Sequence, residues 1–142
     1  MGTEKELFAE RFRSALQNLK KKMTHDFANQ FNHGLTTPQF YILFMIRENG
    51  TCKVTALAEQ MGVKPSAISV MIDKMVNQGY VIRLADTSDR RVVLLQITEA
   101  GLLVVKEFEQ QSNEMIGKYF DKLSVDEIES MIKTFEKMNG TI

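Results

Sequence analysis

The fold is decided by residues 85–95, which read ADTSDRRVVLL: a short polar turn followed at once by an apolar strand. Within it, Asp86–Arg91 hold two aspartates and two arginines among six residues. The flanking segments, Tyr80–Leu84 and Val92–Ile97, are rich in β-branched and aromatic residues and predict a β-hairpin with a charged tip. Most charged turns are simply solvated, so the role of this tip depends on what precedes it.

Two short helices separated by three residues come directly before the hairpin. The apolar spacing predicts helices over Val54–Met61 and Pro65–Gln78, with Gly62-Val63-Lys64 between them. Gly62 permits the backbone to turn sharply, and Pro65 suits the first position of the second helix. The pattern indicates a helix-turn-helix. A hairpin that follows such a motif forms the wing of a winged helix.

The second helix of this motif has two chemically different faces. Its apolar stripe consists of Ala67, Ile68, Met71, Ile72, Met75 and Val76. Its candidate DNA-contacting residues are Lys64, Pro65, Ser66, Ser69, Val70, Asp73 and Lys74. Serine hydroxyls can bond bases or phosphates, and Val70 can contact a thymine methyl group in the major groove. On this helix alone, an ordinary solvated helical hairpin is an equal alternative.

The wing tip supplies cations beside that helix. Arg90 and Arg91 are expected to reach phosphates or a narrow minor groove, whose negative potential attracts arginine. Asp89 is expected to hold the guanidinium of Arg91 in a bidentate pair, which lowers the entropy lost on DNA binding. Asp86 is expected to form the turn by bonding the backbone two residues on. Together these features favour DNA binding over a solvated turn.

Amphipathic helices flank this core on both sides. Apolar residues at helical spacing predict a first helix over Thr3–Asn32, a nearly all-apolar helix after the cap Thr36, a long helix over Glu99–Tyr119, and a last helix after the cap Ser124. The helix after Thr36 is expected at the centre of the core. The expected fold class is therefore mainly α with a small β-hairpin wing.

Composition limits the classes of function. The chain has 142 residues, of which 44% are hydrophobic, and a net charge of zero, so overall charge predicts no nucleic-acid partner. Residues 99–142 hold five Lys and Arg against nine Asp and Glu, which leaves the rest of the chain basic. No apolar run approaches the roughly 18–20 residues of a membrane span. The sequence shows no Gly-rich phosphate loop and no nucleophile–His–acid set, so neither an enzyme nor a cofactor is expected.

With these motifs in place, the chain resembles the MarR family of winged-helix transcriptional regulators over nearly all of its length. Asp86–Arg91 is similar to the family's D-x-x-D-R-R wing, and Ile97–Gly101 is similar to its L-T-x-x-G sequel, with Ile97 in place of Leu. Leu57–Ser69 supports the match. The resemblance carries Asp89, Arg90 and Arg91 over as wing residues that bind DNA.

The resemblance also implies how the chain is organised and what it does. It implies one domain over 1–142, with a winged-helix core over 37–98 and dimerisation helices over 1–33 and 99–142. A homodimer would bind a pseudo-palindromic operator in double-stranded DNA, most simply as a repressor. The single cysteine fits a reducing compartment, so the cytoplasm is the expected location. The alternative is a winged-helix module that binds another protein, because a fold can persist after its DNA contacts are lost.

Members of this family also sense small aromatic or lipophilic ligands, oxidants or metals. The resemblance places an effector cleft at the junction of the first two helices, although aromatic residues at helical spacing more often belong to a core. The candidate cleft residues are Phe27, Phe40 and Phe44. Cys52, the one cysteine, is expected on a short strand as a small buried residue rather than an oxidant sensor. The two histidines, His25 and His33, predict no metal site.

Overall fold

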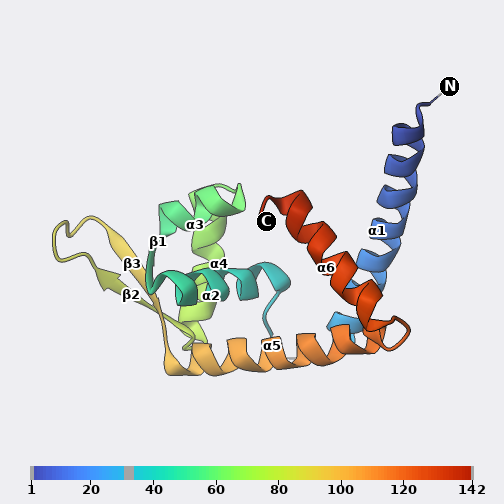
Figure 1. The fold of residues 1–142 in the computed structure, drawn as a ribbon. Helices are drawn as coiled ribbons and strands as arrows, with labels where there is room; N and C mark the ends of the chain where they lie inside the picture. Colours follow the sequence, from blue (N-terminus) through green and yellow to red (C-terminus); the bar gives the residue numbers. More distant parts are fainter. Residues whose placement is uncertain (1, 31–33, 142) are drawn as a thin grey trace. The chain divides into compact units, whose positions relative to one another are not determined.

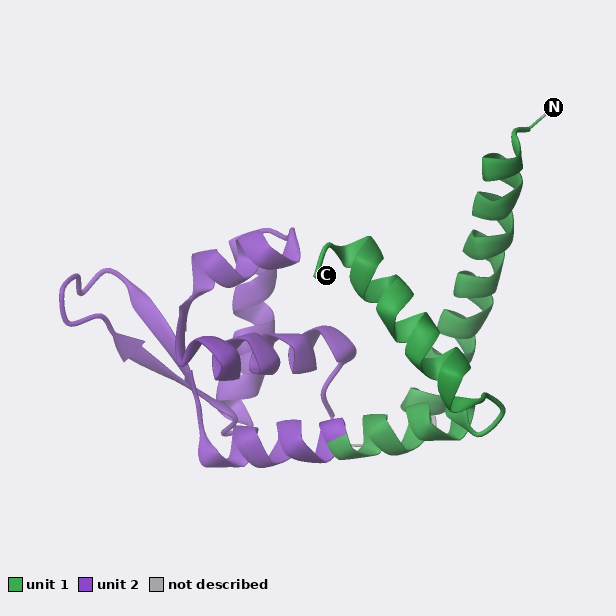
Figure 2. Cartoon of the chain, in the orientation of Figure 1, with its two compact units in different colours: residues 1–31, 110–142 green, residues 32–109 purple. Residues whose placement is uncertain are grey.

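The structure is a computed structural model that describes residues 2–30 and 34–141. The chain forms two compact units (Figure 2). We call residues 1–31 with 110–142 the helical unit, and residues 32–109 the winged-helix unit. One continuous helix, α5, begins in the winged-helix unit and ends in the helical unit.

The elements follow the order that the sequence predicts (Figure 1). They are α1 (Glu4–Gln30), α2 (Thr37–Asn49), β1 (Thr51–Lys53), α3 (Val54–Met61), α4 (Pro65–Asn77), β2 (Val81–Ala85), β3 (Val93–Ile97), α5 (Glu99–Phe120) and α6 (Val125–Asn139). The mainly helical fold class with a hairpin wing is confirmed. The predicted end of the first helix, at Asn32, lies outside the described residues.

Two helices begin at capping boxes, as predicted. At the start of α2, the hydroxyl of Thr36 accepts from the backbone N of Gln39 at 3.4 Å, and the Gln39 side chain accepts from the backbone N of Thr36 at 2.9 Å. Ser124 and Glu127 repeat this exchange at the start of α6. Each box satisfies backbone N–H groups that a helix start leaves without a partner. These two helix boundaries are therefore determined by a few neighbouring residues.

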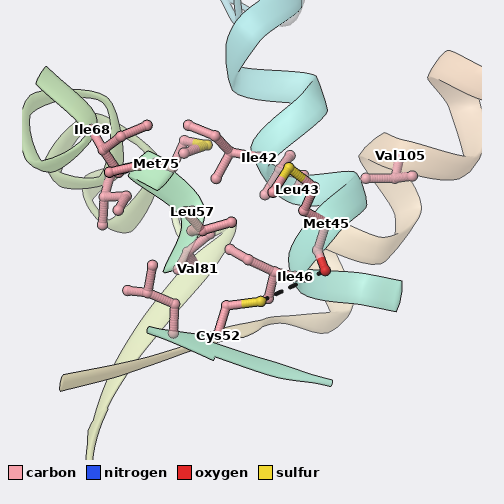
Figure 3. Packing of buried hydrophobic residues seen from close by; sticks show 13 residues of the cluster. Ile42, Leu43, Met45, Ile46, Cys52, Leu57, Ile68, Met75, Val81 and Val105 are labelled. Carbon is pink, nitrogen blue, oxygen red and sulfur yellow. Dashed lines mark hydrogen bonds between the residues drawn. The ribbon is translucent and has the colours of Figure 1, made fainter. Parts of the chain in front are cut away.

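The core of the winged-helix unit surrounds α2 (Figure 3). Its buried apolar side chains come from α2, both helices of the helix-turn-helix, all three strands and α5: Ile42, Leu43, Met45, Ile46, Cys52, Leu57, Ala58, Ile68, Ile72, Met75, Val81, Leu95 and Val105. Burial of each large aliphatic side chain contributes about 1.5–3 kcal/mol. The central position predicted for the nearly all-apolar helix is confirmed.

The apolar stripe of α4 explains how this helix is held. Ile68, Ile72 and Met75 are fully buried against the core. Ala67, which belongs to the apolar stripe in the sequence, is exposed. At 3.6 residues per turn, Ala67 lies about a quarter-turn from the centre of the stripe, at its edge. The opposite face of α4 remains open to solvent.

The three strands form one antiparallel sheet in the order β1-β3-β2. Val81, at the start of β2, is buried and pairs with Ile97, and Leu95 of β3 is buried opposite Cys52. The rest of β2, Ile82–Ala85, is exposed. The hairpin is therefore embedded in the core at its base, and its outer part extends from the winged-helix unit (Figure 1).

The hairpin base is closed by the sequence Ile97–Gly101. The hydroxyl of Thr98 donates to the carbonyl of Gly79 at 2.6 Å and accepts from the backbone N of Gly101 at 3.1 Å. The backbone N of Thr98 donates to the carbonyl of Tyr80 at 3.0 Å. A Cβ on Gly101 would lie 2.3 Å from the Tyr80 carbonyl oxygen, so α5 can approach this backbone only with glycine there.

The helical unit has a different character. Within its described part, Met115 is the one apolar side chain that is buried. Helices α1 and α5 meet where the hydroxyl of Tyr119 donates to Asp26, which raises the pKa of Tyr119 to about 12. The ammonium of Lys22 lies 5.3 Å from the centre of the Tyr119 ring. The described residues of this unit therefore form no apolar core comparable to that around α2.

Replacing Gly101 by alanine tests the close approach of α5. We expect Gly101→Ala to lower the free energy of unfolding by about 1–3 kcal/mol or more, because backbone must move to admit the methyl group. Gly117→Ala is the matched control, since no described atom lies within 4 Å of its added Cβ. There the helix propensity of alanine predicts a gain of up to about 1 kcal/mol. Equal changes for both variants in urea denaturation would contradict this account.

Candidate nucleic-acid interface

The outward face of α4 gathers most of the predicted DNA contacts. The turn before it contains Gly62 in the left-handed conformation at φ 65°, and Pro65 takes the first helical position, both as predicted. Lys64, Ser66 and Val70 are exposed, and Ser69 is half-buried. Val70 leaves 70% of its surface open. An apolar side chain so exposed on a helix face of otherwise small and polar groups suits contact with a thymine methyl group.

The start of α4 also has the electrostatics of an anion site. Lys64 is the capping residue, and its side chain makes no hydrogen bond to the first-turn N–H groups. A helix amino terminus carries partial positive charge and directs N–H groups outward, which favours a phosphate. The ammonium of Lys64 adds a full charge at the same end.

The last two predicted contacts of α4 have partners within the winged-helix unit. Asp73 forms an ion pair with Arg83 of β2. The ammonium of Lys74 donates to the carbonyl of Gly34 at 2.7 Å. Arg83 was missed in the sequence because nothing local shows which strand residue faces α4. The face that is free to contact bases is therefore mainly the first two turns of the helix.

The tip of the wing is a defined turn. The carboxylate of Asp86 accepts from the backbone N of Ser88 at 2.9 Å and from its hydroxyl at 2.8 Å, which confirms the predicted turn. These hydrogen bonds, the backbone one first, hold the pKa of Asp86 below its usual value. The backbone N of Asp86 donates to the carbonyl of Val92 at 3.1 Å and closes the tip.

Asp89 and Arg91 form the predicted contact, but not in the predicted geometry. One carboxylate oxygen of Asp89 accepts from the backbone N of Arg91 at 3.0 Å and from its Nε at 3.2 Å. The backbone bond, then the side-chain bond, lowers the pKa of Asp89. The bidentate pair expected from the sequence is wrong, because the backbone amide and the guanidinium share one oxygen.

This geometry leaves the wing arginines available to DNA. The side chain of Arg91 is 90% exposed, and Arg90 is exposed as well. Lys53, at the end of β1, adds a smaller electrostatic contribution to the lowered pKa values of Asp86 and Asp89. Sequence reasoning missed Lys53, because its place near the tip follows from the pairing of β1 with β3.

The candidate effector residues have packing partners. The ring of Phe40 is buried and stacks on Phe108, with ring centres 4.2 Å apart and an interplanar angle of 16°. The guanidinium of Arg47 lies 4.4 Å from the ring centre of Phe44. Phe27 is half-buried and belongs to the helical unit.

Arg47 also links α2 to α5 inside the winged-helix unit. Its guanidinium donates to both carboxylate oxygens of Glu109, at 3.0 and 2.8 Å. This pairing raises the pKa of Arg47 and lowers that of Glu109. The guanidinium that lies over the Phe44 ring is thus already paired with Glu109.

The remaining candidate residues from the sequence are the single cysteine and the two histidines. Cys52 is buried on β1, as expected, and its thiol donates to the carbonyl of Met45 at 3.7 Å (Figure 3). His25 is exposed, and His33 lies outside the described residues. Among the residues described, no group of three or more His, Cys, Asp or Glu could hold a metal ion. None of the described helices is long and apolar enough to cross a membrane.

Comparison with known proteins agrees with the family resemblance found in the sequence. Residues 35–93 match the model of the MarR family. The transcriptional regulator YpoP of Bacillus subtilis is 30% identical over 87% of this chain and 91% of its own length. The transcriptional repressor MdtR of the same organism is 30% identical over 79% of this chain and 70% of its own length.

A solved structure extends the likeness to three dimensions. The crystal structure of a MepR-like protein complexed with pseudoligands is 41% identical, with a TM-score of 0.64 over 91% of this chain and 92% of that one. The fold, the wing motif and these relatives agree with the family resemblance seen in the sequence, which is thereby confirmed. The chain belongs to the MarR family of transcriptional regulators.

Proposed function

We propose that this chain is a homodimeric repressor that binds a pseudo-palindromic operator in double-stranded DNA. The observation that carries the proposal is the pairing, in one unit, of an exposed helix face with an extended hairpin that presents Arg90 and Arg91. An α-helix fits the major groove of B-DNA, and arginine suits the narrow minor groove beside it. Repression is supported by the relative MdtR, itself a repressor.

We assign the DNA contacts in two groups. The first turns of α4, with Lys64, Pro65, Ser66, Ser69 and Val70, enter the major groove. The second group lies on the wing and consists of Asp89, Arg90 and Arg91. The two arginines contact phosphates and the minor groove, and Asp89 orients Arg91 without touching DNA. Such a protein acts where the chromosome is, in the cytoplasm, and it needs no catalytic group, so we propose that it is not an enzyme.

The second copy is needed to complete the helical unit. Along α1, large apolar side chains stand exposed: Leu7, Phe8, Phe12, Leu16 and Leu19. On α6 the same is true of Ile132, Phe135 and Met138. Apolar surface of this extent marks an interaction site. Because a symmetric dimer buries the same patch on both subunits, one copy can cover the other. The dimerisation role of residues 1–33 and 99–142 rests on this argument.

We retain Phe27, Phe40 and Phe44 as candidate residues for a small aromatic or lipophilic effector. The MepR-like relative was solved as a complex with pseudoligands, which supports the presence of a ligand site in this chain. An effector can relieve repression only if it binds the DNA-competent and DNA-incompetent states with different affinity.

The proposed function is tested by fluorescence anisotropy against the DNA upstream of the chain's own gene, with a scrambled duplex as control, across a salt series. Sequence-selective binding that weakens steeply with salt is the expected result, because binding to phosphates releases counterions. Equal, weak binding to both duplexes would mean that the wing and α4 do not recognise this DNA sequence. It would favour the alternative in which the winged helix binds another protein.

Arg91→Ala tests the wing directly. We expect operator affinity to fall about tenfold or more and the slope of log K against log salt to shrink by about one, because one cationic contact is lost. Arg13→Ala, an exposed arginine of α1, is the control and should leave affinity unchanged. Unaltered binding by Arg91→Ala would remove the wing from the interface.

Ser69→Ala distinguishes base contact from phosphate contact. If the hydroxyl bonds a base, the cost on the cognate site is about 1–3 kcal/mol and much smaller on random DNA. An equal loss on both DNAs would assign Ser69 to a phosphate.

Replacement of two apolar side chains on α1 tests the dimer. We expect the double variant Phe12→Asp, Leu16→Asp to shift the sedimentation coefficient from dimer toward monomer, because it places two charges in an interface that must be apolar. The control is Gln17→Asp, which lies on the opposite side of α1 by helical periodicity. A double variant that sediments like the unaltered protein would exclude this face as the interface.

A further inference from the structure

The ion pair between Asp73 of α4 and Arg83 of β2 joins the recognition helix to the wing outside the hydrophobic core. We propose that this pair positions the wing, so that Arg91 at its tip meets the groove next to the one that α4 occupies. Asp73 and Arg83 are then positioning residues rather than DNA contacts. The inference rests on the proposed DNA-binding function and adds to it the residues that set the geometry of the interface.

The need for such a contact follows from how little of the hairpin is buried. In β2 only Val81 lies in the core, with 1% of its surface open, whereas Ile82 and Leu84 expose 41% and 38%. A two-stranded hairpin without core packing is marginally stable by itself and twists readily. Apolar packing therefore fixes the base of the wing but not the direction of its outer half relative to α4.

Arg83 is placed where one contact can set that direction. Side chains alternate between the two faces of a strand, so Arg83 shares a face with Val81, which packs into the core beside α4. Arg83 lies two residues beyond the buried base and pairs across the sheet with buried Leu95. From this position its guanidinium reaches Asp73 in the third turn of α4.

From Arg83 to the tip of the wing, backbone hydrogen bonds join the two strands without a break. The ladder runs through Ala85 and Val93, and the bond from the Asp86 backbone N to the Val92 carbonyl continues it. Asp89 then holds Arg91 through two hydrogen bonds. A change in the direction of β2 at Arg83 is thus carried to the guanidinium of Arg91.

The charges support positioning over direct contact. A bare carboxylate on the DNA-facing helix would be repelled by phosphates, and the pair with Arg83 cancels the charge of Asp73. Side chains of Asp73 and Arg83 are 62% and 40% exposed, so the pair contributes little to stability. Its effect should therefore appear in the geometry of the wing and not in the melting temperature.

The test is a double-mutant cycle between Arg83 and Arg91, measured as operator affinity by anisotropy. In the otherwise unaltered chain, Arg91→Ala is expected to lower operator affinity about tenfold. In the Arg83→Gln or Asp73→Asn background it should lower affinity only about threefold or less, because a misdirected wing has already lost the contact between Arg91 and DNA. Arg83→Lys keeps the charge and should restore most of the Arg91 contribution. Melting temperatures of all these variants should match that of the unaltered chain.

Two results would overturn the inference while leaving the proposed function intact. One is a cost of Arg91→Ala that is the same in every background. The other is an altered base preference in Asp73→Asn, which would make Asp73 a base contact. If the unaltered chain shows no selective DNA binding, the proposed function itself fails.

A second measurement needs no DNA. Backbone ¹⁵N relaxation of the free protein should show that residues 86–91 become more mobile in Arg83→Gln, while the rigid base at Val81 does not change. Arg13→Gln, on α1, is the control. Unchanged relaxation at the tip would contradict a positioning role for Arg83 whatever the DNA measurements show.

Discussion

The first turn of α5 packs onto the carbonyl of Tyr80, where a side chain larger than glycine does not fit, and Thr98 bonds the backbone on both sides of that contact. This contact joins the end of α4 to the end of β3, so both strands of the wing start from fixed points beside the recognition helix. The core around α2 holds α4 from behind through Ile68, Ile72 and Met75. The exposed groups of the proposed DNA interface therefore depend on these buried groups for their position.

The two units differ in how much apolar surface they bury. The winged-helix unit buries a continuous apolar cluster, and burial of this cluster stabilises its fold. The described part of the helical unit buries almost none of its apolar residues. Most of the stability of a helix such as α1 comes from packing of its apolar face, because its own hydrogen bonds contribute little. The proposed dimer would cover the exposed apolar face of that unit. It also supplies the second recognition helix that a two-fold operator requires.

Much of this architecture could be predicted because the deciding signals are local. Capping boxes at Thr36 and Ser124, Gly62 in its turn and the Asp86 turn each act within four residues, and all appear as expected. The partners of Asp73 and Lys74 could not be predicted, since they depend on which strand or loop residue comes to face α4. The geometry of Asp89 and Arg91 was wrong for a related reason: the backbone amide competes for the same oxygen.

The most direct test of the account is chemical footprinting of the dimer on the DNA upstream of its own gene. Hydroxyl radicals report minor-groove protection, and guanine N7 methylation reports the major groove. We predict two major-groove sites about one helical turn, ~10 bp, apart, each flanked by minor-groove protection. In Arg91→Ala only the minor-groove protection should disappear. Minor-groove protection that persists without Arg91, or major-groove sites without this spacing, would contradict a dimer that reads DNA through α4 and the wing.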